Sequence, residues 1–178
     1  MKKSLLISLV SLLPALSFAG TAPFGDAKSI KEAADLWKTL ESNSLVGSNA
    51  IMSKPYKGVP PHGTILDTIE GKATVNGHTG TVIIKRNYGG AGVDVAKVYN
   101  NPKAYLGAVT VMYKRESGYD LDNKDWFWAK YKPDGSLHLN PKKMQLAGRI
   151  AKGAPQGCIA CHKAAPGGDY VFNNDRYK

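Results

Sequence analysis

The clearest helical pattern lies near the N-terminus, at residues 29–42. Apolar side chains recur there at helical spacing on one face: Ile30, Ala33, Ala34, Trp37 and Leu40. Ser29 followed by Glu32 has the form of a capping box, in which each side chain bonds a backbone N–H of the first turn. Asn and Ser accumulate at 42–44, where we expect the helix to end.

After residue 60 the helical spacing gives way to alternation, which is typical of half-buried strands. Branched and aromatic residues favour strands at 64–69, 81–88, 105–115 and 126–131, with a short fifth strand at 137–139. The runs are closely spaced, and no long helices alternate with them, so the pattern predicts antiparallel hairpins. The predicted fold is mainly β (α+β), an antiparallel sheet with one N-terminal helix.

Residues 1–19 have the features of a secretory signal peptide. Lys2 and Lys3 precede an apolar run at 5–16, and small residues follow at the cleavage position. The apolar run is too short to span a bilayer, so we expect no stable membrane insertion; a retained anchor is the alternative. Residues 20–178 then form one exported domain, expected in the periplasm and long enough for a real core.

The chain is strongly basic, with a formal charge of +10 that falls to +8 without the two lysines at its start. Such a charge favours acidic partners or anionic surfaces through long-range steering, although an ordinary solvated basic surface is the simpler interpretation. Nucleic acid is not an expected partner, because the basic residues are dispersed and the chain is predicted to be exported.

The strongest chemical signal is the run Cys158-Ile159-Ala160-Cys161-His162. A C-x-x-C-H run is the attachment site of a c-type haem. Each thiol forms a thioether with a haem vinyl group, and the adjacent imidazole reaches the iron as its proximal ligand. The sequence therefore predicts one covalent haem c, held by Cys158 and Cys161, with His162 as the metal ligand.

Other uses of this motif fit less well. A structural zinc site needs four ligands, but these are the only two cysteines and the other histidines are scattered singly. A thioredoxin-like pair sits at the end of a strand and has no need of the adjacent histidine. A plain disulfide is possible, but it closes a very small loop.

Two familiar cytochrome architectures also fit the surrounding chain poorly. Cytochromes c′ need four long amphipathic helices, and this chain shows one. Small electron-transfer cytochromes c carry the haem motif near the N-terminus with a Met ligand downstream. Here only 16 residues follow His162, and none is Met.

Three stretches resemble the cytochrome P-460 family, which includes the cytochromes c′-beta: 62–85, 108–131 and 157–172. They contain, in this order, His-Gly with Ile-Ile-Lys, Val-Met-Tyr-Lys with Trp-Phe-Trp-Ala-Lys, and the haem motif with Asp-Tyr-Val-Phe. The resemblance implies an antiparallel β domain, usually a homodimer, with a five-coordinate haem iron that is open on its distal side. Cytochromes P-460 oxidise hydroxylamine and link a lysine covalently to the haem, whereas cytochromes c′-beta bind gases such as nitric oxide.

Lys85 stands at the position of the cross-linking lysine. On a strand it shares a face with Ile83 and Asn87, so it faces whatever Ile83 faces. A buried lysine is costly unless it is neutralised or paired, which favours a functional reason for its position. The alternative is a lysine on an exposed edge strand, where its charge prevents aggregation.

The match to the hydroxylamine-oxidising members is incomplete. Leu66 stands where the family enzyme has a distal arginine, and Arg86 stands where an acid is expected after the lysine. No Asp or Glu occurs between Asp134 and Asp169 to serve as a base for proton removal. We therefore expect an apolar distal pocket, lined in part by Leu66, that suits a small neutral gas.

The remaining candidates are interpreted mainly as structural. His62, in a Pro-Pro-His-Gly turn, is interpreted as a turn histidine held by backbone contacts, although it could lie near the distal side. His78 and His138 are expected to be exposed. Three methionines are conceivable sixth ligands, of which Met112 fits a core role better: Met52, Met112 and Met144. Trp126 and Trp128 are expected on one strand face and Phe127 on the other.

Three functions remain open from the sequence. The first is a haem protein that binds nitric oxide or a similar small ligand at an open iron. The second is a hydroxylamine oxidoreductase with haem linked to Lys85. The third is an electron carrier whose basic surface docks an acidic redox partner protein, which requires a sixth protein ligand to the iron.

Overall fold

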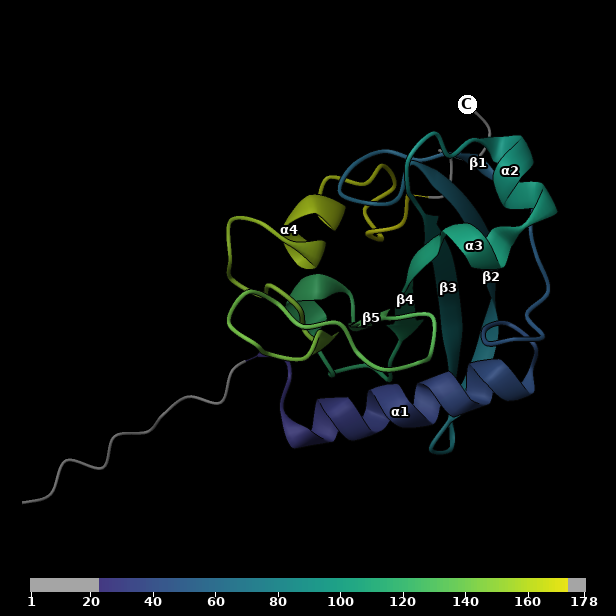
Figure 1. Ribbon diagram of the computed structural model, residues 1–178. Coiled ribbons are helices and arrows are strands. Elements are labelled where there is room, and N and C mark those ends of the chain that lie inside the picture. The colour runs from purple at the N-terminus through teal and green to yellow at the C-terminus, as the bar shows by residue number, and fades with distance from the viewer. Residues whose placement is uncertain (1–22, 173–178) are drawn as a thin grey trace, which may run out of the picture.

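The computed structural model describes residues 23–172, so the predicted signal peptide lies outside the described residues. The domain is built on a six-stranded antiparallel sheet whose strands follow one another in sequence order. A long helix, α1, lies along one side of this sheet. The short helix α4, the last helix in the sequence, lies on the other side, away from α1 (Figure 1). The prediction of a mainly β domain with an N-terminal helix is confirmed.

The strands of the sheet are β1 (Tyr56–Lys57), β2 (Ile65–Val75), β3 (His78–Tyr88), β4 (Leu106–Lys114), β5 (Trp126–Tyr131) and β6 (Ala147–Gly148). The helices are α1 (Ala27–Ser42), α2 (Val95–Asn100), α3 (Pro102–Tyr105), the 3₁₀ turn η1 (Leu121–Asn123) and α4 (Cys158–His162). No helix within residues 23–172 combines the length and apolar character of a membrane span.

The hairpin of β2 and β3 is longer than the sequence pattern predicted. Residues 70–75 continue β2, because buried Ala73 and Val75 alternate there with exposed neighbours. Asn76 and Gly77 alone form the turn, with φ values of 50° and 84°. Asn and Gly tolerate this left-handed conformation, which matches the twist of two adjacent strands.

The predicted strand at 137–139 is wrong. That segment makes only two isolated bridges, Tyr131 with Leu137 and Leu139 with Gln145. The last strand of the sheet is instead β6, where Ala147 and Gly148 pair with β5.

The predicted cap of α1 is also wrong by one turn. Asp26 is the N-cap, and its carboxylate accepts the backbone N–H of Ser29 at 2.9 Å. Ser29 and Glu32 therefore lie inside the helix rather than at its start. The Glu32 carboxylate pairs with the Arg115 guanidinium on the loop after β4.

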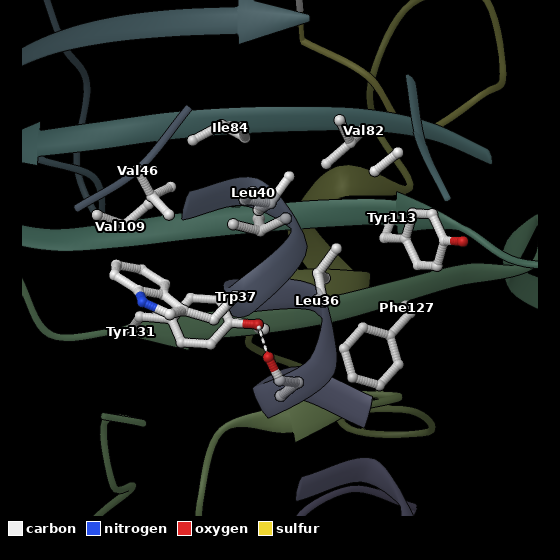
Figure 2. Packing of buried hydrophobic residues seen from close by; sticks show 14 of the residues in the cluster. Leu36, Trp37, Leu40, Val46, Val82, Ile84, Val109, Tyr113, Phe127 and Tyr131 are labelled. Carbon is white, nitrogen blue, oxygen red and sulfur yellow. Dashed lines mark hydrogen bonds between the residues drawn. The ribbon is translucent and has the colours of Figure 1, made fainter. Parts of the chain in front are cut away.

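One face of the sheet packs against α1 and forms the main apolar core. Leu36 and Leu40 are fully buried against Val82, Ile84 and the neighbouring strands (Figure 2). The Tyr131 hydroxyl donates a hydrogen bond of 2.9 Å to the Ala33 carbonyl of α1 (Figure 2). Closely packed apolar side chains fill the space between this face and α1.

The other face packs against α4 and the C-terminal segment. Its apolar cluster consists of Ile83, Met112, Trp126, Trp128, Ile150, Ile159 and Tyr170. Trp126 and Trp128 lie in this cluster and Phe127 lies in the α1 core, as the alternation predicted. The haem motif is thus placed on the side of the sheet opposite α1.

Candidate functional site

The two cysteines lie in the single short turn of α4. Cys158 and Cys161 are three residues apart, a spacing that places both on the same side of a helix, and they form no disulfide. Burial raises the pKa of the Cys158 thiol to about 11. A redox-active thiol needs a lowered pKa, so this environment argues against thioredoxin-like chemistry.

His162, at the end of α4, is buried and held in one orientation. Its Nδ1 donates a hydrogen bond of 2.6 Å to the backbone carbonyl of Tyr170. Because a carbonyl can only accept, Nδ1 carries the proton and Nε2 keeps the lone pair. This is the arrangement that orients a histidine as a metal ligand.

Three aromatic rings surround the imidazole of His162. The ring centroids of Trp128, Phe172 and His62 lie 4.8, 5.3 and 6.1 Å from its own. The indole N–H of Trp128 is buried and has no hydrogen-bond partner among residues 23–172. A buried donor without an acceptor is costly, and a haem carries carboxylates that accept hydrogen bonds. The two thiols, the oriented His162 and this donor fit a haem c.

The segment 169–172 connects this histidine to the sheet. Three of its backbone carbonyls accept side-chain donors: Asp169 from Trp126 Nε1 at 2.9 Å, Tyr170 from His162, and Phe172 from Lys85 Nζ at 2.8 Å. Tyr170 adopts a positive φ of 65°, an unusual conformation for a large side chain. The ammonium of Lys85 and the imidazole of His162 thus bind carbonyls only two residues apart.

Lys85 lies in a central strand rather than at an edge. It pairs with Thr68 of β2 and Thr110 of β4 and is 5% exposed. The exposed-edge alternative is therefore wrong. Lys85 faces the same side as Ile83 and Asn87, as the alternation predicted, and this is the side that carries α4.

Leu66 lies on the same side of the sheet, because it pairs directly with Asn87. Arg86 lies on the opposite side, where its Nε is 3.2 Å from the Asp67 carboxylate. The Tyr88 hydroxyl completes this buried group with a bond of 2.6 Å to Asp67. The replacement of an acid by Arg86 therefore does not change the side chains that surround Lys85.

The surroundings of Lys85 are more polar than the expected apolar pocket. The Thr68 hydroxyl bonds the Tyr56 hydroxyl at 2.7 Å, and the Thr110 hydroxyl bonds the Lys85 carbonyl at 3.3 Å. The amide of Asn87 joins this group to the loop that carries His62, at 3.0 Å. The alternation in β3 predicted that Asn87 shares the face of Lys85, but it could not predict the partners of Asn87 on the loop that carries His62.

The other histidines are less exposed than expected. His78 is half-buried, and its Nε2 donates to the Lys114 carbonyl at 3.0 Å. His138 is half-buried, and its Nε2 has no hydrogen-bond partner within residues 23–172. Met112 packs in the cluster on the α4 side, which confirms its core role.

Two free cysteines and an oriented histidine, at the end of an antiparallel β domain, define a c-type haem protein. The family model for cytochrome P460 matches residues 43–173, which include the sheet, Lys85 and the haem motif. The chain therefore belongs to the cytochrome P460 family and is a haem c cytochrome. Searches of curated proteins and of solved structures gave no match.

Proposed function

We propose that this cytochrome carries one covalent haem c on Cys158 and Cys161 and binds a small ligand such as nitric oxide at the haem iron. The observation that carries the proposal is the buried imidazole of His162, whose Nδ1–H is held by the Tyr170 carbonyl. That bond leaves Nε2 as the iron ligand. The bound haem supplies an iron centre that binds a neutral diatomic ligand.

The chain's own residues would hold this centre in three ways. The thiols anchor it to α4, and Trp128 packs against the proximal imidazole, with ring centroids 4.8 Å apart. The segment 169–172 fixes the imidazole from behind. On the sheet, Leu66 and the polar group around Lys85 line the side on which a ligand would bind.

An optical titration tests this proposal. Addition of nitric oxide or carbon monoxide to the ferrous protein should shift the haem absorption bands and saturate at one ligand per haem. The variant Cys161→Ser, purified in parallel, reports how far one thioether supports the same spectrum. An unchanged spectrum of the wild-type protein at saturating gas, in both redox states, would contradict the proposal.

A second candidate function is hydroxylamine oxidation with the haem linked to Lys85. The buried position of Lys85 on the α4 side supports it. Mass spectrometry of the digested protein should then find the Lys85 peptide joined to the haem peptide. The link should disappear in Lys85→Met and remain in Lys130→Met, because Lys130 lies in register with Thr110 on the same face. A haem peptide without Lys85 in the wild-type protein excludes this candidate.

We further propose that the protein is exported to the periplasm, forms a homodimer and docks an acidic redox partner through its basic surface. Cleavage after residue 19 would give a mature periplasmic protein that begins at Gly20, which N-terminal sequencing checks. Light scattering of the mature protein tests the proposed homodimer. A basic surface that docks an acidic redox partner predicts electron transfer that slows as salt rises.

A further inference from the structure

His62 and His162 bring two imidazoles together on the α4 side of the sheet. Their ring centroids lie 6.1 Å apart, and their planes meet at 79°. They are one hundred positions apart in the sequence, so the approach depends on how the loop 58–63 docks onto β3. This pairing is unexpected for a family whose iron is typically five-coordinate.

The tautomer of His62 follows from the hydrogen bonds of Asn87. The Nδ2 group of Asn87 donates to the carbonyls of Lys85, at 2.8 Å, and Ala108, at 3.4 Å. Neither carbonyl can donate, so the amide nitrogen must face them and Oδ1 must face the loop. Oδ1 accepts from the Gly63 N–H at 3.2 Å and from His62 Nδ1 at 3.0 Å. His62 Nδ1 is therefore protonated, and Nε2 carries the lone pair that a metal needs.

The loop that presents His62 is packed tightly against the sheet. A Cβ on Gly63 would lie 2.6 Å from the backbone N and O of Tyr88, so only glycine allows this approach. A Cβ on Gly58 would lie 2.0 Å from the Gly63 carbonyl. The His62 N–H also bonds the Val59 carbonyl at 3.1 Å. These contacts fix where the imidazole lies.

Both imidazoles thus share one arrangement: Nδ1–H is bound to a protein oxygen, and Nε2 is the acceptor. Metal–imidazole bonds of about 2.0 Å on opposite sides of one iron would separate the two ring centroids by about 6 Å. The observed 6.1 Å agrees with that separation. We infer that His62 is the second axial ligand of the haem iron when no external ligand is bound.

Other candidate ligands fit less well. Met112 lies in the apolar cluster among Ile83 and Trp128. The Lys85 ammonium donates to the Phe172 carbonyl. Neither has the imidazole's combination of proximity to His162 and a fixed acceptor nitrogen.

This inference deepens the proposed function, on which it rests, by adding a step before ligand binding. A small ligand reaches the iron only after His62 Nε2 leaves it. The apparent affinity is then the intrinsic affinity multiplied by the fraction of molecules in which His62 is dissociated. The iron would be six-coordinate at rest. The family resemblance implied a five-coordinate iron that is open on its distal side.

Optical and magnetic spectra of the holoprotein test the inference. The wild-type protein should be six-coordinate and low-spin in both redox states. The variant His62→Ala should be high-spin, and added imidazole should restore the low-spin spectrum. His78→Ala, which removes another half-buried histidine, at the start of β3, should keep the wild-type spectrum. Carbon monoxide should bind His62→Ala with an apparent affinity roughly tenfold higher, or more, than wild type.

Near-infrared magnetic circular dichroism of the ferric wild-type protein identifies the axial pair without any variant, so the test survives if His62→Ala does not fold. A band of the bis-histidine type supports the inference. A high-spin wild-type iron, or a different axial pair, overturns it and leaves gas binding intact. Failure of both wild type and His62→Ala to bind carbon monoxide or nitric oxide overturns the proposed function instead.

Discussion

The two faces of the sheet come from the same strands but serve different purposes. On the α1 face, alternate residues of β3, β4 and β5 are apolar and pack against Leu36 and Leu40. On the α4 face, the intervening residues include Lys85, Asn87 and Thr110, whose polar groups bind one another and nearby loops. The period of two in each strand lets one sheet carry both a core and a site.

The two faces differ in the cost of burying their side chains, which is higher for the polar groups of the α4 face. A buried lysine, amide or imidazole must find hydrogen-bond partners, whereas a buried leucine needs only shape complementarity. The α4 face meets this requirement with backbone carbonyls from segment 169–172 and with the loop that carries His62. Its geometry therefore depends on a loop and on the C-terminal segment, whereas the α1 face is covered mainly by the single helix α1.

The largest stability effect is expected on the α1 face. Leu36→Ala removes a fully buried side chain from the centre of the core and should lower the free energy of unfolding by about 2–5 kcal/mol. Urea denaturation followed by circular dichroism measures this change. Lys38→Ala, exposed on the same helix, should have little effect. A decrease in the free energy of unfolding of less than about 1 kcal/mol, well below the usual cost of a core cavity, would show that α1 is not the principal cover of the sheet.

A smaller loss of stability, with a spectral change, is expected on the α4 face. Asn87→Ala leaves the Gly63 N–H and His62 Nδ1 without their acceptor and should cost roughly 1–3 kcal/mol. It should also raise the high-spin fraction of the haem, since His62 is no longer held. Thr81→Ala, on the same strand and face, is the matched control. Identical haem spectra for Asn87→Ala and wild type would show that Asn87 does not hold His62 at the haem iron.

The helix cap gives a third, smaller effect that is confined to α1. Asp26→Ala removes the acceptor of the Ser29 N–H and should reduce stability by about 1 kcal/mol without any change in the haem spectrum. Thermal unfolding measures the first effect and absorption the second. Lys28→Ala, exposed in the same turn, should leave both unchanged. A spectral change in Asp26→Ala would show that the two faces are coupled.

The smallest expected effect is a pH dependence of stability that arises from His138, beside β5. Burial, with a smaller effect from Lys130, lowers the pKa of His138 below its usual 6.5. The unfolded chain then binds the proton more readily, so this contribution to stability is present above pH 6.5 and is lost as the pH falls through the lowered value. His138→Gln should flatten the decline in melting temperature in that range. Parallel pH profiles for the variant and wild type would contradict this account.

Local pattern predicted the parts of the fold that depend on neighbouring residues. Alternation located β5 at Trp126–Tyr131 and placed Lys85 on the face of Ile83. The cap was misplaced because Asp26 and Ser29 both precede the helical pattern. In the structure the Asp26 carboxylate accepts the Ser29 N–H, and Glu32 is buried against Arg115 instead of completing a capping box.

The site depended on contacts between distant segments, which the sequence pattern does not record. The haem motif could be read directly, because its three residues are adjacent. The approach of His62 to His162 requires the loop at Gly63 to dock on Tyr88, and the hold on Lys85 requires the C-terminal segment to return to β3. Alternation along β3 also places Arg86 on the opposite side of the sheet from Lys85. The family pattern alone, in which an acid follows the lysine, does not show this.

Nuclear magnetic resonance of the ferric holoprotein tests the contrast between the two faces most directly, because the unpaired electron of the iron shifts and broadens nearby signals. The methyl groups of Ile83 and Met112 on the α4 face should show strong effects, and those of Leu36 and Leu40 on the α1 face should show weak ones. Strong effects on the leucine methyls, with none on Ile83 and Met112, would contradict the account.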